Sequence, residues 1–149
     1  MRKIVLFFIA LAFTGRGVAQ DKLSGDQLAV QQIMAGVFES LTNRDSVTLK
    51  ELCSRDVRFY EYGMTWTIDS LIRRGITENQ ATDFTRTNSL EFLETAINGQ
   101  TAWATYRLRS TITRAGKETQ VEWLETVVLV KDKKRWKLKV LHSSLLKRT

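Results

Sequence analysis

The sequence predicts an α+β domain in which N-terminal helices pack on one face of a curved antiparallel sheet. Apolar residues recur at helical spacing in the first half of the chain. The second half contains four long runs rich in Thr, Val, Leu and aromatic residues, separated by short turns. Helices followed by strands are typical of α+β folds. The 149 residues, 43% hydrophobic and 26% charged, suit a single globular domain, which we place at residues 24–147.

Residues 1–19 are predicted to be a secretory signal peptide. Two basic residues precede an apolar run over residues 4–13, and small residues at 17–19 suit a cleavage site. The apolar run is too short to span a bilayer as a helix, so we expect no integral membrane span. Cleavage after Ala19 would remove three basic residues and no acidic one, which lowers the formal charge from +7 to +4. We therefore expect an exported protein, periplasmic or secreted.

Three helices are predicted before residue 76. Ser24 and Gln27 have the spacing of a capping box, and the stripe behind them predicts one broad apolar helix face. Asp45 can cap a short second helix that runs through Cys53. A third helix begins behind Thr67 or Asp69, and Gly75 can end it. The stripe of the first helix consists of Val30, Ile33, Met34, Val37, Phe38 and Leu41.

The strands are predicted as one short aromatic strand and a four-stranded meander. The short strand covers residues 57–62, and the long runs cover residues 82–97, 101–114, 117–131 and 136–146. The turns between the long runs are Asn98-Gly99, Ala115-Gly116 and residues 132–135. Such short turns fix which residues face one another across the sheet.

The order of these elements, together with three segments, resembles the nuclear transport factor 2-like superfamily, and most closely its SnoaL-like branches. The segments are the amphipathic helix at 26–42, SRDVRFYEYGMTWTIDSL at 54–71, and VKDKKRWKLKVLHSS at 130–144. The resemblance implies a cone-shaped fold with a pocket between sheet and helices, usually in a dimer. Members of the superfamily range from isomerases, dehydratases and polyketide cyclases to non-catalytic binding and assembly modules, so the fold constrains the reaction weakly.

Counting residues across the turns predicts a polar row inside the pocket. Tyr106 should face Glu125 on one side and Glu91 on the other, and Glu125 should face His142. The candidate ligand-binding residues are Tyr60, Trp66, Glu91, Tyr106, Trp123, Glu125 and His142. Tyr60 and Trp66 would lie near the mouth, either stacking on a flat ligand or filling the core.

His142 and Glu125 allow two readings. They can form a general acid/base pair in which the carboxylate fixes the imidazole tautomer, or His142 can be a structural, hydrogen-bonded residue of the sheet. Because Cys53 is the sole cysteine and His142 the sole histidine, internal disulfides and Cys/His zinc sets are excluded, and we expect no metal. The common nucleotide-binding and hydrolase motifs are also missing, so we expect no cofactor.

Two functions therefore remain open. The first is an exported, non-catalytic pocket domain that binds a small apolar or amphipathic molecule or mediates assembly. The alternative is a SnoaL-like isomerase, cyclase or dehydratase that uses Glu125 and His142 for proton transfer. The outer sheet face, with Trp103, Leu124, Val128 and Phe92, is expected to form a homodimer. The basic run at 131–139 reads as a solvated turn, so no nucleic-acid partner is expected.

Overall fold

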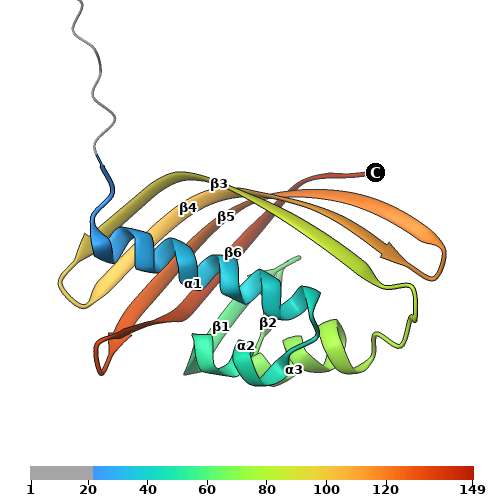
Figure 1. Ribbon diagram of the computed structural model, residues 1–149, viewed down its shortest axis with the longest axis horizontal. Coiled ribbons are helices and arrows are strands. Elements are labelled where there is room, and N and C mark those ends of the chain that lie inside the picture. The colour runs from blue at the N-terminus through green and yellow to red at the C-terminus, as the bar shows by residue number, and fades with distance from the viewer. Residues whose placement is uncertain (1–21) are drawn as a thin grey trace, which may run out of the picture.

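The protein is a curved sheet whose concave face is covered by helices, as Figure 1 shows. The computed structural model describes residues 22–149, so the predicted signal peptide lies outside the described residues. The helices are α1 (Gly25–Thr42), α2 (Ser46–Leu52), α3 (Ile68–Ile72) and the π-helix η1 (Arg73–Thr77). The strands are β1 (Cys53–Glu61), β2 (Met64–Trp66), β3 (Thr85–Asn98), β4 (Thr101–Arg114), β5 (Lys117–Asp132) and β6 (Arg135–Arg148). Within this part of the chain, no helix is long and apolar enough to cross a membrane.

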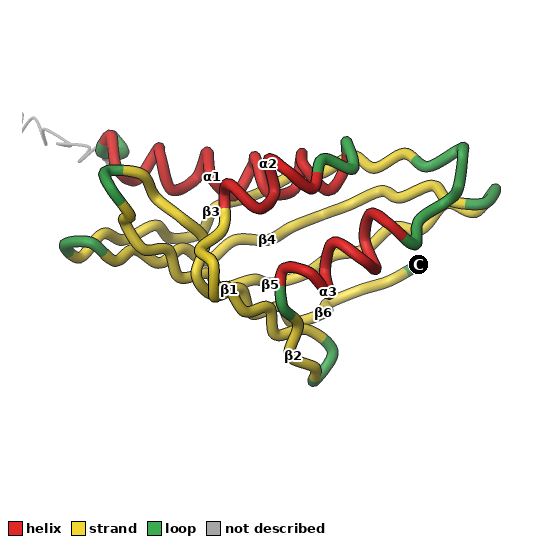
Figure 2. Tube along the Cα trace, turned by 90° about the horizontal axis from the view of Figure 1, so that it is seen from below, coloured by secondary structure: helices red, strands yellow, loops and turns green. Residues whose placement is uncertain are grey.

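The six strands form one sheet in the order β2-β1-β6-β5-β4-β3. The predicted meander from β3 to β6 is confirmed, but the sheet is mixed because β1 runs parallel to β6. Parallel strands need a long connection between them. Here α3, η1 and three long strands lie between β1 and β6 in the sequence. Figure 2 shows α1 and α2 on one side of the sheet, and α3 contacts β1.

Helix α1 forms as its sequence predicts and supplies much of the core. The Ser24 hydroxyl accepts a hydrogen bond from the Gln27 backbone amide at 3.2 Å, and the Gln27 side chain accepts one from Ser24 N at 2.8 Å. The apolar stripe packs against the interior residues of the sheet, with Val30 and Met34 fully buried. This packing fixes α1 across the concave face, where it forms one wall of a cavity.

Two predicted helix ends are wrong. Helix α2 is capped by Asp45 as expected but ends at Leu52, because Cys53 already pairs with Leu138 of β6. The third helix does not end at Gly75, because the chain continues through it as the π-helix η1. The short strand β2 was not predicted, and it forms because Tyr62 and Gly63 both adopt positive φ in a two-residue turn.

Strand register is as predicted for β4–β5 and differs on both sides of it. Between β4 and β5, Tyr106 faces Glu125 and Arg109 faces Glu122, as counted from the Ala115-Gly116 turn. The first hairpin turns at Gly99-Gln100 instead of Asn98-Gly99, and β3 has a bulge between Phe92 and Glu94. Strand β6 has one bulge between Leu138 and Val140 and another near its end, so residues after Leu138 shift by one position.

Candidate functional site

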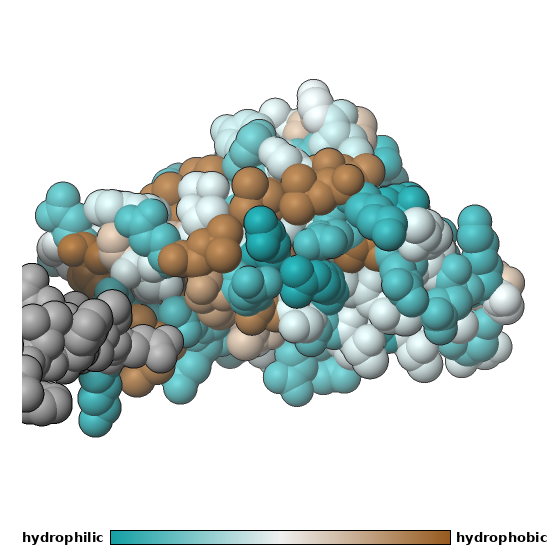
Figure 3. Space-filling model, turned by 90° about the horizontal axis from the view of Figure 1, so that it is seen from above, coloured by the Kyte–Doolittle hydropathy of each residue, from teal (hydrophilic) through white to brown (hydrophobic). Residues whose placement is uncertain are grey.

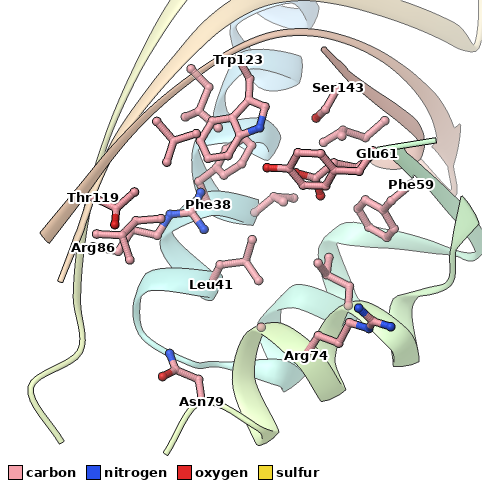
Figure 4. A pocket seen from close by; sticks show the side chains of 18 of the residues that line it. Phe38, Leu41, Phe59, Glu61, Arg74, Asn79, Arg86, Thr119, Trp123 and Ser143 are labelled. Atoms are coloured by element: carbon pink, nitrogen blue, oxygen red, sulfur yellow. The ribbon is translucent and has the colours of Figure 1, made fainter. Parts of the chain in front are cut away.

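A cavity of about 490 Å³ opens between the C-terminal half of α1, the α3–η1 segment and the concave face of the sheet. Its volume falls in the range of small-molecule sites, roughly 300–1,000 Å³. Most of its wall is apolar, contributed by Phe38 and Leu41 of α1, Phe59 of β1 and Leu108 of β4. Figure 4 shows Phe38, Leu41 and Phe59 around a space into which several polar groups point.

Glu125 is the buried carboxyl group of this cavity. It lies on β5 with 3% of its surface exposed, between Tyr106 of β4 and Ser143 of β6. The Ser143 hydroxyl donates a 2.5 Å hydrogen bond to Glu125 Oε1. Burial raises the pKa of Glu125 to about 7, against the opposing effect of the Ser143 hydrogen bond. The group can therefore hold or release a proton near neutral pH.

Four buried polar atoms form no hydrogen bond with any group in residues 22–149. They are Asn79 Oδ1, Tyr106 OH, Trp123 Nε1 and Glu125 Oε2. Asn79, Trp123 and Glu125 line the cavity, and Tyr106 lies directly opposite Glu125 in the sheet. Burial raises the pKa of Tyr106, so its hydroxyl stays protonated and can donate. Buried polar groups are nearly always paired, so unpaired ones around a cavity indicate water or a ligand.

Arg86 and Glu61 place opposite charges on two walls of the cavity. Figure 4 shows the Arg86 guanidinium of β3 reaching in from one side and Glu61 of β1 lying across from it. Arg86 Nε donates to Asn88 Oδ1 at 2.8 Å, and Nη2 donates to Ser110 Oγ at 3.2 Å. Burial lowers the pKa of Arg86 and raises the pKa of Glu61. Both charges are therefore held where water solvates them poorly.

The structure brings together four of the seven predicted site residues. Tyr106, Trp123 and Glu125 share the interior face as the β4–β5 register predicts, and Trp66 lines the cavity from β2. The guanidinium carbon of Arg74 lies 4.9 Å from the centre of a Trp66 ring, at the cavity mouth. Whether these residues bind a ligand stays a prediction, but their predicted positions are correct.

The predicted position of His142 beside Glu125 is wrong. The bulge after Leu138 shifts the strand by one residue, so His142 faces Thr126 and is exposed on the outer face of the sheet. Ser143 takes the interior position instead. A one-residue shift moves a side chain to the opposite face, so the Glu125–His142 proton-transfer pair does not exist.

Glu91 and Tyr60 also lie outside the cavity. Glu91 faces Arg107 rather than Tyr106, and its carboxylate pairs with Arg109 at 3.2 Å on the outer face. Phe92 takes the interior place, because burying an aromatic ring is favourable whereas burying a carboxylate is costly. Tyr60 is 39% exposed and lies beside His142 on the outer face.

Sequence reasoning missed several polar residues of the cavity, among them Glu61, Asn79, Arg86 and Ser143. Arg86 could have been found, because it lies in phase with Phe84, Leu90 and Phe92 in an alternating strand pattern. Asn79 follows η1 in a short loop, and nothing in the sequence marks it. Among the described residues, no group of three or more His, Cys, Asp or Glu side chains could hold a metal ion.

The sequence of the chain matches a known family over most of its length. The profile of the SnoaL-like domain family matches residues 30–147. The chain belongs to this SnoaL-like family. This confirms the resemblance to the nuclear transport factor 2-like superfamily, and the helices on a curved sheet are its cone-shaped α+β fold. Among curated proteins, none matches the chain.

Solved structures with the same fold come from proteins with different functions. An NTF2-like protein from Cytophaga hutchinsonii ATCC 33406 is 12% identical, with a TM-score of 0.67 over 83% of this chain and 100% of its own. A hexachlorocyclohexane dehydrochlorinase is 11% identical, with a TM-score of 0.68 over 83% and 87%. A CaMKII hub from S. rosetta is 20% identical, with a TM-score of 0.67 over 84% and 100%. At these identities the likeness establishes the fold of this SnoaL-like domain, not its activity.

Proposed function

We propose that this SnoaL-like domain binds a small, largely apolar organic molecule that carries hydrogen-bonding groups. The observation that carries the proposal is the cluster of unpaired buried polar atoms around an apolar cavity of about 490 Å³. An apolar molecule fills the space between Phe38, Phe59 and Leu108, while its polar groups satisfy Trp123 and Glu125. Ordered water alone is the competing explanation, so the test must detect an organic occupant.

The test uses the neutral fluorophore N-phenyl-1-naphthylamine and a variant that fills the cavity. Ile112 lines the cavity, whereas the neighbouring Thr113 points to the opposite face of β4. Ile112→Trp should weaken binding roughly tenfold or more by occupying the apolar space, and Thr113→Trp should leave it unchanged. Native mass spectrometry of protein from its own host would identify a retained molecule. Equal binding by both variants, or none by the wild type, contradicts the proposal.

Proton transfer by Glu125 is a second candidate function, and one observation favours it. Burial raises the pKa of Glu125 to about 7, against the opposing effects of Ser143 and Tyr106, and its Oε2 atom forms no hydrogen bond in the described chain. If the retained molecule is a carbon acid, incubation in heavy water should place deuterium at its acidic carbon with the wild type. Glu125→Gln should abolish that exchange and keep the binding. Exchange that survives in the variant contradicts a catalytic role for Glu125.

We further propose that the domain is exported and forms a homodimer through its outer sheet face. Export is supported by the sequence pattern of residues 1–19, and the mature protein from its host should begin at Gln20. The dimer is supported by large apolar side chains on the outer face, among them Leu93, Trp103 and Leu124, which are 36–51% exposed. In Figure 3, which views the convex side, hydrophobic side chains gather in a band rather than singly.

A further inference from the structure

The charged residues of the cavity are unequal in number and are not paired with one another. Seven charged side chains line it: Arg74, Arg86, Arg114, Lys117, Arg148, Glu61 and Glu125. Within residues 22–149, all six ion pairs lie elsewhere, and none includes a cavity residue. Burial also raises the pKa of both acidic residues, which favours their neutral forms. The cavity therefore contains five basic and two acidic side chains, which is an excess of positive charge.

Arg86 is a base of the cavity whose pKa is lowered by burial. Its guanidinium carbon lies 5.6 Å from the centre of the Phe38 ring, and two of its nitrogens donate to Asn88 and Ser110. These contacts hold the side chain in one orientation, while its Nη1 group has no hydrogen-bond partner among residues 22–149. Arg86 forms no contact ion pair with Glu61 or Glu125. A poorly solvated charge without such a contact is costly, so an oxyanion placed here gains both ion pairing and hydrogen bonds.

From this arrangement we infer that the bound molecule is an organic anion: an apolar body ending in a monoanionic oxyacid group, carboxylate or sulfonate, received by Arg86. This inference rests on the proposed ligand-binding function and names the class of ligand. The apolar body lies among the rings of Phe38 and Phe59, with its anionic end toward β3. The exposed bases Arg114 and Lys117 line the same cavity and attract such an anion from solution.

The test compares two fluorophores that differ in one group. 8-Anilino-1-naphthalenesulfonate and N-phenyl-1-naphthylamine share the same rings, and only the first carries a sulfonate. The wild type should bind the sulfonate roughly tenfold more tightly or better, since a charge-assisted hydrogen bond adds that much. Arg86→Gln should remove this preference and leave binding of the neutral probe within about twofold. Arg86→Lys keeps the charge but loses the fork of donors, so it should retain part of the preference.

Arg109→Gln is the matched control. Arg109 lies on the outer face of the sheet, paired with Glu91 and Glu122, so its loss removes a charge outside the cavity. The preference for the sulfonate should survive in this variant. Equal wild-type affinity for the two probes, or equal weakening of both by a folded Arg86→Gln variant, overturns the inference. If Arg86→Gln folds poorly, the wild-type comparison and Arg86→Lys decide. If the wild type does not bind N-phenyl-1-naphthylamine, that result would instead contradict the proposed function itself.

Discussion

The buried carboxyl group of Glu125 affects the stability of the fold and is also a candidate for ligand binding or proton transfer. Its carboxyl group is buried at 3% exposure and receives one hydrogen bond, from Ser143, while its second oxygen has no partner in the described chain. Such a group destabilises the folded protein when it is ionised. A ligand that donates a hydrogen bond to it stabilises the folded protein. Sites that hold an unpaired carboxyl group of this kind are candidates for binding or proton transfer.

The pH dependence of stability should reveal this carboxyl group. The pKa of Glu125 is about 7 in the folded protein against an ordinary 4.5, so between these values the native state holds more protons than the unfolded chain. The free energy of unfolding should therefore fall as pH rises from about 4.5 to about 7 and level off above that. Near pH 8, Glu125→Gln should be the more stable protein by a few kcal/mol, at about 1.4 kcal/mol per pKa unit.

Denaturant unfolding at a series of pH values provides the measurement. Glu122→Gln is the matched control, because Glu122 lies on the outer face of the same strand and pairs with Arg109. Its profile should follow the wild type. Glu61 has a raised pKa as well, so a residual slope should remain in Glu125→Gln. Parallel profiles for the wild type and Glu125→Gln would show that the Glu125 carboxyl group is not perturbed.

At the scale of elements, strand β6 determines which residues reach the cavity. The bulge after Leu138 turns Ser143 inward and His142 outward. The pair tests the register directly. Ser143→Ala removes the hydrogen bond to a buried carboxyl group and should lower the free energy of unfolding by about 1–3 kcal/mol. His142→Ala changes an exposed side chain and should alter it by less than about 0.5 kcal/mol, as measured by thermal or denaturant unfolding. If His142→Ala lowered the free energy of unfolding more than Ser143→Ala, His142 would lie inside the cavity, as the count from the turns predicted.

Sequence reasoning succeeded where local chemistry decides the structure. The capping box at Ser24, the cap at Asp45 and the Ala115-Gly116 turn could all be read from residue types, and the β4–β5 register followed from that turn. Bulges could not be counted, because one extra residue in a long strand leaves no mark on composition. The inward alternation of Leu90 and Phe92 did oppose placing Glu91 inside, and the structure follows the apolar residues.

At the scale of the whole molecule, the proposed homodimer depends on the outer face of the sheet. Trp103 is 38% exposed on β4, within an apolar surface that a second copy of the chain would cover. Trp103→Lys should convert a dimer into a monomer, because the variant places a charge in that contact. Light scattering after size exclusion measures the mass. Val47→Lys is the control, since Val47 is 68% exposed on α2 and its replacement should leave the dimer intact. A monomeric wild type would contradict the proposed dimer.

The last strand has a practical consequence for every binding measurement. Arg148 lines the cavity and donates to the Tyr62 hydroxyl, and the backbone of Thr149 exchanges hydrogen bonds of 2.9 and 3.0 Å with Gln120. A purification tag fused after Thr149 would begin next to Arg148 of the cavity, and a polyhistidine tag would add titrating charges there. Affinities should therefore be compared between protein with the tag attached and protein from which it has been cleaved.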